Sequence, residues 1–170
     1  MQLLERVVSR VVCCNYGGSV RQEPTPDGLE ALLMELVIEM GLQRGDALVP
    51  DLAMTLSEGL ALLEIWHTGP VPQQHIADRL RLEKSSVSRL VAGLERKGWL
   101  VRERDQANRR YYRLMLSDAG RAVVTRMSTH LHERHGQVLT RLSGTERSAL
   151  AVALPALTRA LRETTAAAAT

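Results

Sequence analysis

The side chains best suited to chemistry in this sequence are small, hydroxyl and guanidinium groups on one face of a predicted helix over residues 84–97. At 100° per residue, the side opposite the apolar stripe of this helix holds Ser85, Arg89, Ala92 and Arg96. Small residues permit close approach, a serine hydroxyl bonds phosphates or base edges, and an arginine can bind guanine through two hydrogen bonds. The pattern favours a helix that reads a nucleic-acid groove over the alternative, a solvated helix start with a capping serine.

Basic side chains are concentrated around this helix. Residues 78–113 carry eleven Lys or Arg against five Asp or Glu, a local balance of +6, although the whole 170-residue chain has a net charge of only +3. The remaining residues therefore sum to −3. One compact basic segment on a neutral to acidic body is expected of a protein that meets a polyanion with one face.

Other classes of function find little support. The sequence has no phosphate-binding glycine loop, no G-x-G-x-x-G, no G-x-S-x-G and no carboxylate pair in a defined frame, so we expect no enzyme activity. No stretch is long and apolar enough for a membrane span, and Glu5 stands where a secretory signal has a basic residue. The only cysteines, Cys13 and Cys14, are neighbours and form no disulfide framework. These features predict a cytoplasmic protein that does not bind membranes.

Two short helices around a tight turn are predicted to position the Ser and Arg face. A helix over residues 73–80 and a three-residue turn precede the helix over 84–97, and together they form a helix-turn-helix unit. After Gly98 the hydrophobic period changes from helical to alternating, which predicts strands over 99–104 and 111–116 around a charged loop. A basic hairpin directly after a helix-turn-helix is a wing. The apolar stripe of the second helix is formed by Val87, Leu90, Val91 and Leu94.

Further helices are predicted on both sides of this unit. A short leading helix is followed by a linker, and a second helix begins with Asp27 as its N-cap. A third helix is expected to start with Ser57 as its cap. After the wing, Ser117 caps a long helix, and residues 143–146 form a capping box for the last one.

Three further expectations concern packing. Pro155 falls inside the last helix, so we expect a kink there or a stop just before it. The Ala and Thr tail from residue 164 lacks an amphipathic face and is expected to be frayed. Trp66 and Trp99 are expected in the core.

The stretch from Thr55 to Val124 resembles the MarR (multiple antibiotic resistance regulator) family of bacterial winged-helix repressors. The resemblance runs without a gap, and its order of helix-turn-helix, wing and Leu-Ser-x-x-Gly is specific. The matching segments are Gln73-Gln-His-Ile-Ala-Asp-Arg-Leu80, Leu82-Glu-Lys-Ser-Ser-Val-Ser-Arg-Leu-Val91, Leu94-Glu-Arg-Lys-Gly98, the wing from Arg102 to Arg110, and Leu116-Ser-Asp-Ala-Gly120.

The resemblance implies a fold that is mainly α with a small β-hairpin wing, in which a winged helix-turn-helix DNA-binding domain over residues 55–116 lies between N- and C-terminal dimerisation helices. These helices correspond to residues 27–50 and 117–163, with an extra N-terminal helix over 1–16 and a frayed tail over 164–170. A two-fold homodimer of this kind predicts a pseudo-palindromic operator in double-stranded DNA. The implied function is a sequence-specific transcriptional regulator, most often a repressor relieved by a small molecule. The ligand, when one exists, is expected in the crevice between the dimer helices and the winged unit.

The expected DNA contacts combine the reading helix and the wing. Arg96, Arg102 and Arg104 are expected either to contact phosphates or to pair within the protein. The sequence departs from the family at Pro72, where a capping Ser or Thr is usual, so the first helix is expected to start on Pro72 with weaker capping. It also has Asn108 in place of the second Asp of the wing, which removes one acid from the tip. The predicted contact residues are Lys84, Ser85, Ser86, Ser88, Arg89, Arg96, Asn108, Arg109 and Arg110.

Sensing by metal or by thiol oxidation is the alternative for the same fold. His130, His132 and His135 form the only histidine cluster, and Cys13 or Cys14 could complete a nitrogen and sulfur site of the kind that zinc-sensing family members use. The same cysteines raise the peroxide-sensing branch of the family. Surface histidines and buried, inert thiols are the simpler interpretation, so we assign no metal and no cofactor. A winged-helix module that binds protein or metal instead of DNA is the remaining alternative.

Overall fold

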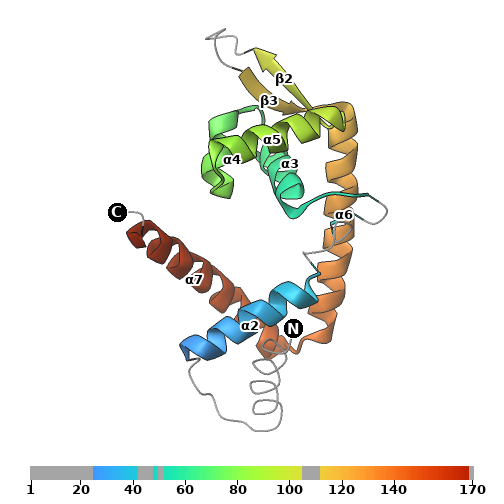
Figure 1. The fold of residues 1–170 in the computed structure, drawn as a ribbon. Coiled ribbons are helices and arrows are strands. Elements are labelled where there is room, and N and C mark those ends of the chain that lie inside the picture. Colours follow the sequence, from blue (N-terminus) through green and yellow to red (C-terminus); the bar gives the residue numbers. More distant parts are fainter. Residues whose placement is uncertain (1–24, 42–47, 50–51, 105–111, 169–170) are drawn as a thin grey trace, which may run out of the picture. The chain divides into compact units, whose positions relative to one another are not determined.

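The computed structural model describes residues 25–41, 48–49, 52–104 and 112–168. Within these ranges the chain is mainly helical with one small antiparallel sheet, as predicted (Figure 1). The extra helix predicted over residues 1–16 and the loop between the wing strands lie outside the described residues. None of the described helices has the length and apolar character needed to cross a membrane.

The elements follow the predicted order, apart from one short strand that the sequence analysis did not anticipate. They are α2 (Pro26–Glu39), α3 (Leu56–Thr68), β1 (Val71–Pro72), α4 (Gln73–Leu80), α5 (Lys84–Arg96), β2 (Leu100–Arg104), β3 (Tyr112–Leu116), α6 (Asp118–Arg141) and α7 (Gly144–Ala168). The chain divides into two compact units, residues 1–124 and 125–170, so α6 begins in the first unit and continues in the second.

The predicted helix-turn-helix is confirmed as α4 and α5. Arg81 ends α4 in the left-handed conformation, with φ of 54°. Because a left-handed residue reverses the chain direction sharply, residues 81–83 suffice to connect the two helices. The apolar stripe of α5 packs inward as expected: Leu90 is half-buried, and the fully buried members are Val87, Val91 and Leu94.

The wing is a three-stranded antiparallel sheet with strand order β1-β3-β2. Leu100 lies opposite Leu116 at one end of the β2–β3 pair, and Arg104 lies opposite Tyr112 at the other. Leu100 and Leu116 are buried, whereas Arg104 and Tyr112 are exposed. The hairpin is therefore anchored in the core at one end and extends into solvent at the other.

The unpredicted strand, β1, pairs with β3 on the side away from β2, with Val71 opposite Leu114. A proline is tolerated in β1 because an edge strand bonds on one side only. Pro72 also occupies the N-cap position of α4 and makes no side-chain cap bond. α4 begins at Gln73, in agreement with the range predicted for this helix, and not on Pro72 itself. The weaker capping expected at Pro72 is confirmed.

The apolar core lies in the winged unit, by which we mean the segment from Leu48 to Met127 that contains α3 to β3 and the first part of α6. Every buried apolar residue that the structure describes falls between Leu48 and Met127. The largest side chains with almost no exposure include Met54, Leu62, Ile76, Leu94, Leu114 and Met127. They come from α3, α4, α5, β3 and α6 and the segment before α3. The inward side of α5 is thus held by a core that the rest of the winged unit builds.

The two tryptophans differ from each other. Trp99 is 8% exposed, which confirms its expected place in the core. Trp66 is 43% exposed, so the same expectation for Trp66 is wrong. Its neighbour Ile65 is 3% exposed, and one residue further along a helix turns the side chain by about 100°, away from the buried face.

Two predicted helix caps also need correction. Thr25 rather than Asp27 caps α2, and Thr55 rather than Ser57 caps α3. In both cases the threonine hydroxyl accepts the backbone N–H three residues later, at 3.2 Å. Glu58 completes a capping box by accepting the N–H of Thr55 at 2.8 Å. Threonine is thus the N-cap residue at the start of both helices.

The start of α6 is tied to the end of α5. As predicted, Ser117 caps α6, because its hydroxyl oxygen accepts the N–H of Gly120 at 3.0 Å. The same hydroxyl donates to the carbonyl of Gly98 at 2.5 Å, and the N–H of Ser117 donates to the carbonyl of Trp99 at 3.2 Å. A Cβ atom at Gly120 would clash with that Trp99 carbonyl, so only glycine fits this approach of helix to strand.

The last helix, α7, is more regular than predicted. The capping box that begins at Ser143 is confirmed, with both of its backbone bonds present. Pro155 lies inside the helix, which continues to Ala168, so the expected stop before the proline and the frayed tail from residue 164 are wrong. The hydroxyls of Thr164 and Thr165 donate to carbonyls four residues earlier and add bonds to the final turns.

Candidate nucleic-acid interface

The predicted reading face of α5 points to solvent. Its half-buried member is Ser86, and the exposed residues are Lys84, Ser85, Ser88, Arg89, Ala92 and Arg96. The opposite side of the same helix is packed in the core. The helix can therefore present hydroxyl, ammonium and guanidinium groups to a ligand without any change in its own packing.

Arg89 lies near the middle of this face. Its guanidinium donates a long hydrogen bond of 3.4 Å to the hydroxyl of Ser86, one turn earlier. A guanidinium has five N–H donors in a fixed fork, so this one weak bond does not saturate it. Arg89 is therefore placed to offer a bidentate donor pair to a base edge or a phosphate.

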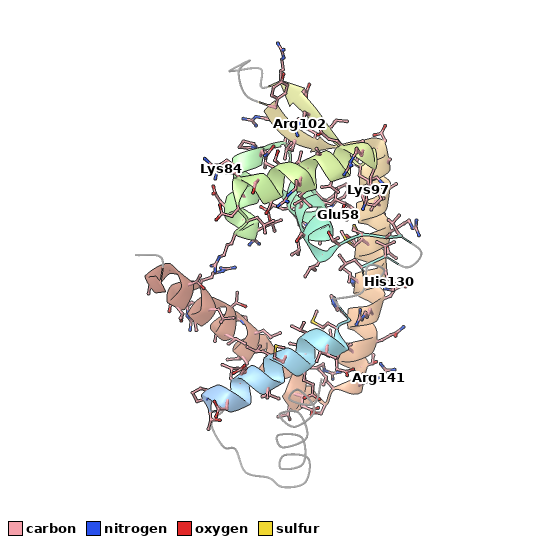
Figure 2. The ribbon with its side chains drawn as sticks, viewed as in Figure 1. Glu58, Lys84, Lys97, Arg102, His130 and Arg141 are labelled. Carbon is pink, nitrogen blue, oxygen red and sulfur yellow. The ribbon has the colours of Figure 1, made fainter. Side chains whose placement is uncertain are left out.

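The two lysines of the chain lie at opposite ends of α5 (Figure 2). Lys84 is in the first turn and exposed. Lys97 is the C-cap, and its Nζ lies 2.8 and 2.9 Å from the two carboxylate oxygens of Glu58 and 3.0 Å from the carbonyl oxygen of Ala53. Both lysines belong to the basic segment over residues 78–113 and both are exposed, but the ammonium of Lys97 also contacts Glu58 and Ala53.

Glu58 is the acidic partner of Lys97 and was not among the functional residues predicted from the sequence. Burial alone would raise the pKa of Glu58, because burial disfavours the charged carboxylate. Hydrogen bonds from Lys97 and Thr55 and the charge of Lys97 outweigh burial, so the pKa of Glu58 lies below its ordinary value of 4.5. No local sequence pattern indicates this pair, because its members are 39 residues apart.

Two arginines of the basic window also have acidic partners. Arg102 Nε lies 2.9 Å from Glu95 Oε1, which selects internal pairing from the two roles expected for Arg102. Arg79 Nε lies 2.9 Å from Glu64 Oε2. Glu64 lies outside residues 78–113, so its pair with Arg79 offsets part of the +6 balance, whereas Glu95 is already counted in that sum. The exposed cations of α5 are Lys84, Arg89 and Arg96.

Glu64 joins α3 to α4 through several donors. Besides Arg79, its carboxylate contacts His75 Nε2 at 2.8 Å and accepts from the hydroxyl of Thr68 at 3.2 Å. The His75 hydrogen bond is the main reason that the pKa of Glu64 lies below its ordinary value, and Arg79 and Thr68 lower that pKa further. A groove of about 430 Å³ lies beside this cluster, lined by Ser57, Leu60, Leu63, Glu64, His67, Arg79, Leu80 and Arg81.

The tip of the wing, with Asn108, Arg109 and Arg110, lies outside the described residues, so its contacts with DNA stay a prediction. At the base of the tip, the guanidinium of Arg104 lies 5.9 Å from the centre of the Tyr112 ring on the paired strand. Arg104 is exposed, so this cation–π contact leaves it on the surface of the hairpin.

The histidine cluster, His130, His132 and His135, lies on α6. Among the described residues, no group of three or more His, Cys, Asp or Glu side chains is arranged to hold a metal ion. Cys13 and Cys14 lie outside the described residues, so their share in a metal or redox site stays untested.

The comparisons with known proteins give one family match, which covers part of the chain. The MarR family model matches residues 54–112, which run from just before α3 into β3. No curated protein matches the chain. The matched range contains every predicted contact residue, both on α5 and in the wing.

Solved structures match this chain over nearly their whole length. A MarR family protein from Bacillus stearothermophilus is 22% identical, with a TM-score of 0.67 over 79% of this chain and 93% of that one. The PcaV transcriptional regulator from Streptomyces coelicolor, in complex with its natural ligand, is 21% identical, with a TM-score of 0.61 over 85% and 99%. A mutant of MepR from Staphylococcus aureus, bound to an oligodeoxyribonucleotide, is 24% identical, with a TM-score of 0.54 over 78% and 97%. At these identities the likeness shows the fold.

Proposed function

We propose that this chain is a transcriptional repressor of the MarR family, whose model matches residues 54–112, that it binds a pseudo-palindromic operator as a homodimer, and that a small molecule releases it. The family is one of regulators rather than enzymes. The observation that carries the proposal is the outward face of α5, where Ser85 and Arg89 are exposed on a helix whose other side is locked in the core.

Affinity and specificity have different sources in this proposal. Basic side chains such as Lys84 and Arg96 neutralise phosphates, and the release of counterions from DNA supplies affinity that is independent of sequence. Arg89 and Ser85 reach base edges in the major groove and supply discrimination. The bound oligodeoxyribonucleotide of the MepR mutant is consistent with this use of the fold.

The homodimer is supported by apolar side chains that the chain leaves uncovered. The helix α2 has no buried residue, and its exposed apolar side chains are Leu32, Met34, Leu36, Val37 and Ile38. Contiguous exposed apolar surface marks interaction sites in proteins. In a two-fold dimer of this kind, the two copies of α5 would meet half-sites about one helical turn of DNA apart.

Release by a small molecule is supported by the relative PcaV, whose structure contains its natural ligand. In our proposal an effector binds between the dimer helices and the winged unit and changes the separation of the two copies of α5. An effector that prefers the new separation lowers DNA affinity by the same factor by which DNA lowers effector affinity.

Mobility-shift and anisotropy titrations test the proposal. A duplex would first be selected by the full chain from a random pool, and its affinity compared with that of an unselected duplex at several salt concentrations. Arg89→Ala is expected to weaken binding to the selected duplex by about 1 to 3 kcal/mol, because one base contact is lost.

Arg159→Ala is the matched control, since Arg159 is an exposed arginine on α7, outside the matched family segment. It is expected to leave the preference for the selected duplex unchanged. A chain that prefers no duplex over bulk DNA would contradict the proposed function. A preferred duplex bound equally by Arg89→Ala would show that Arg89 does not read a base.

A further inference from the structure

Lys97 is a cation of the basic segment over residues 78–113 whose ammonium is held by the protein itself. Its ammonium has three N–H donors, and it contacts both oxygens of Glu58 and the carbonyl oxygen of Ala53, all within 3.0 Å. It also lies 4.8 Å from the centre of the Trp99 ring. These contacts occupy the donors that a phosphate would need.

The contacts of Lys97 join the end of α5 to the start of α3. Glu58 is 8% exposed and sits in the first turn of α3, where it also accepts the N–H of Thr55. Ala53 lies just before α3. The Lys97 ammonium thus adds a polar link between two helices that also contribute buried side chains to the core.

The same end of α5 is held from a second side. The residues after Lys97 are Gly98 and Trp99, and their carbonyls accept from the hydroxyl and the N–H of Ser117 at the start of α6. At the other end, the N-cap Glu83 makes no side-chain cap bond. The C-terminal end of α5 is therefore held by contacts with the start of α3 and the start of α6. Lys84 and Lys97 mark the two ends of the helix in Figure 2.

We propose that Lys97 is a positioning residue that fixes the orientation of α5 through Glu58 and does not contact DNA. This inference rests on the proposed function, because it assigns Lys97 a part in operator reading. A bidentate contact between arginine and guanine tolerates displacements of only about 0.5 Å and 10–20°. Without the tie, α5 pivots about its remaining contacts, and Arg89 leaves that range. Phosphate contacts tolerate the same pivot because Lys and Arg side chains are long and flexible.

The test compares the two lysines of α5 in the full chain. Lys97→Met and Lys84→Met each remove one charge and keep a long apolar side chain. Binding to the selected duplex and to a random duplex would be measured by anisotropy at several salt concentrations, with circular dichroism as the check of folding. Lys97→Met is expected to bind the selected duplex at least tenfold more weakly, to bind the random duplex within twofold of wild type, and to keep the salt slope.

Lys84→Met is expected to behave in the opposite way, because it removes a phosphate contact. Binding to both duplexes should weaken, and the slope of log affinity against log salt should fall by about 0.9 for each protomer. A Lys97→Met slope that falls in the same way would overturn the inference and make Lys97 a phosphate contact. Unchanged affinity of Lys97→Met for the selected duplex would also overturn it.

Glu58→Gln provides a second variant that keeps the shape of the side chain. It should lower affinity for the selected duplex with the slope unchanged, and its effect should not add to that of Lys97→Met in the double variant. Fully additive losses would overturn the tie between the two residues. A wild-type chain that prefers no duplex would overturn the proposed function, whereas a preferring wild type with an unaffected Lys97→Met would overturn this inference alone.

Discussion

The winged unit and the flanking helices α2 and α7 differ in how far their apolar side chains are buried. All buried apolar residues that the structure describes lie between Leu48 and Met127, and neither α2 nor α7 contributes one. On α2, Leu32 is 54% exposed, and on α7, Val152 is 74% exposed. The winged unit therefore buries its own apolar side chains, whereas the apolar side chains of α2 and α7 stay exposed to solvent.

The local signals of helix formation do not distinguish the two regions. A capping box starts α3 in the winged unit, and another starts α7. Both are complete, and both are readable from four residues of sequence. The regions differ instead in long-range contacts, so variants that act on packing should separate them more sharply than variants that act on propensity.

The largest effect is expected from Gly120→Ala, at the junction of α6 with the winged unit. The added methyl group would run into the Trp99 carbonyl, whose carbon would lie 2.9 Å away, and backbone cannot give way as a side chain can. We expect a loss of about 3 kcal/mol or more in the free energy of unfolding, measured by urea denaturation.

Gly136→Ala is the control on the same helix. No atom lies within 4 Å of a Cβ at Gly136, so the change should stabilise α6 by up to about 1 kcal/mol. Equal effects of the two variants would contradict the close approach at Gly120 and, with it, the view that α6 is fixed where it meets the winged unit.

The second effect is expected from Leu36→Glu on α2. Leu36 is 49% exposed, so the winged unit should keep its fold, but a charge would be buried in the proposed dimer twice by symmetry. We expect the dimer dissociation constant to rise by at least tenfold, about 1.4 kcal/mol, in sedimentation equilibrium. Glu35→Gln, at an exposed neighbour, should leave the constant unchanged. An unaltered dimer in Leu36→Glu would exclude this face of α2 from the interface.

The sequence predicted those features that depend on neighbours within a few positions. The reading helix, the hairpin strands, the Ser117 cap and the box at Ser143 all rest on such patterns, and the structure confirms them. The exposed face of α5 was also predictable, because the burial of one side of a helix determines the other. The choice of Thr25 over Asp27 as a cap had an overlooked local signal, since Pro26 is favoured at the first position of a helix.

The remaining features depend on contacts between distant residues. The strand β1 has two residues and exists only through its pairing with β3. From the sequence alone, Lys97 is one more basic side chain, because its pairing with Glu58 becomes visible only in the structure. Trp66 is a large apolar residue of the kind usually found in a core, but it follows the buried Ile65 on α3 and therefore lies on the exposed side of that helix. The charge count over residues 78–113 was therefore correct. It did not show which of these charges are paired within the protein and which are available to DNA.

The smallest effects on the free energy of unfolding are expected from variants of the two capping-box glutamates, Glu58 and Glu146. The two residues should differ in how this effect changes at low pH. Hydrogen bonds hold the pKa of Glu58 and of Glu146 below the ordinary value of 4.5. A lowered pKa in the folded state stabilises the fold above pH 4.5, and this contribution is lost as pH falls through the folded pKa. Glu58 is buried beside Lys97, whereas Glu146 is exposed to solvent.

Glu58→Gln is therefore expected to cost about 1 kcal/mol of unfolding free energy at pH 7, because the hydrogen bonds from Lys97 lose their charged acceptor. The difference from wild type should narrow as pH falls below 4.5, where the wild-type carboxylate also loses its charge. Glu146→Gln should show a smaller difference at every pH, since solvent screens its charge. Urea titrations at pH 3, 5 and 7 measure both variants. A cost of Glu58→Gln that is the same at all three pH values would show that shape rather than charge makes Glu58 matter, and would leave Lys97 without an ionic partner.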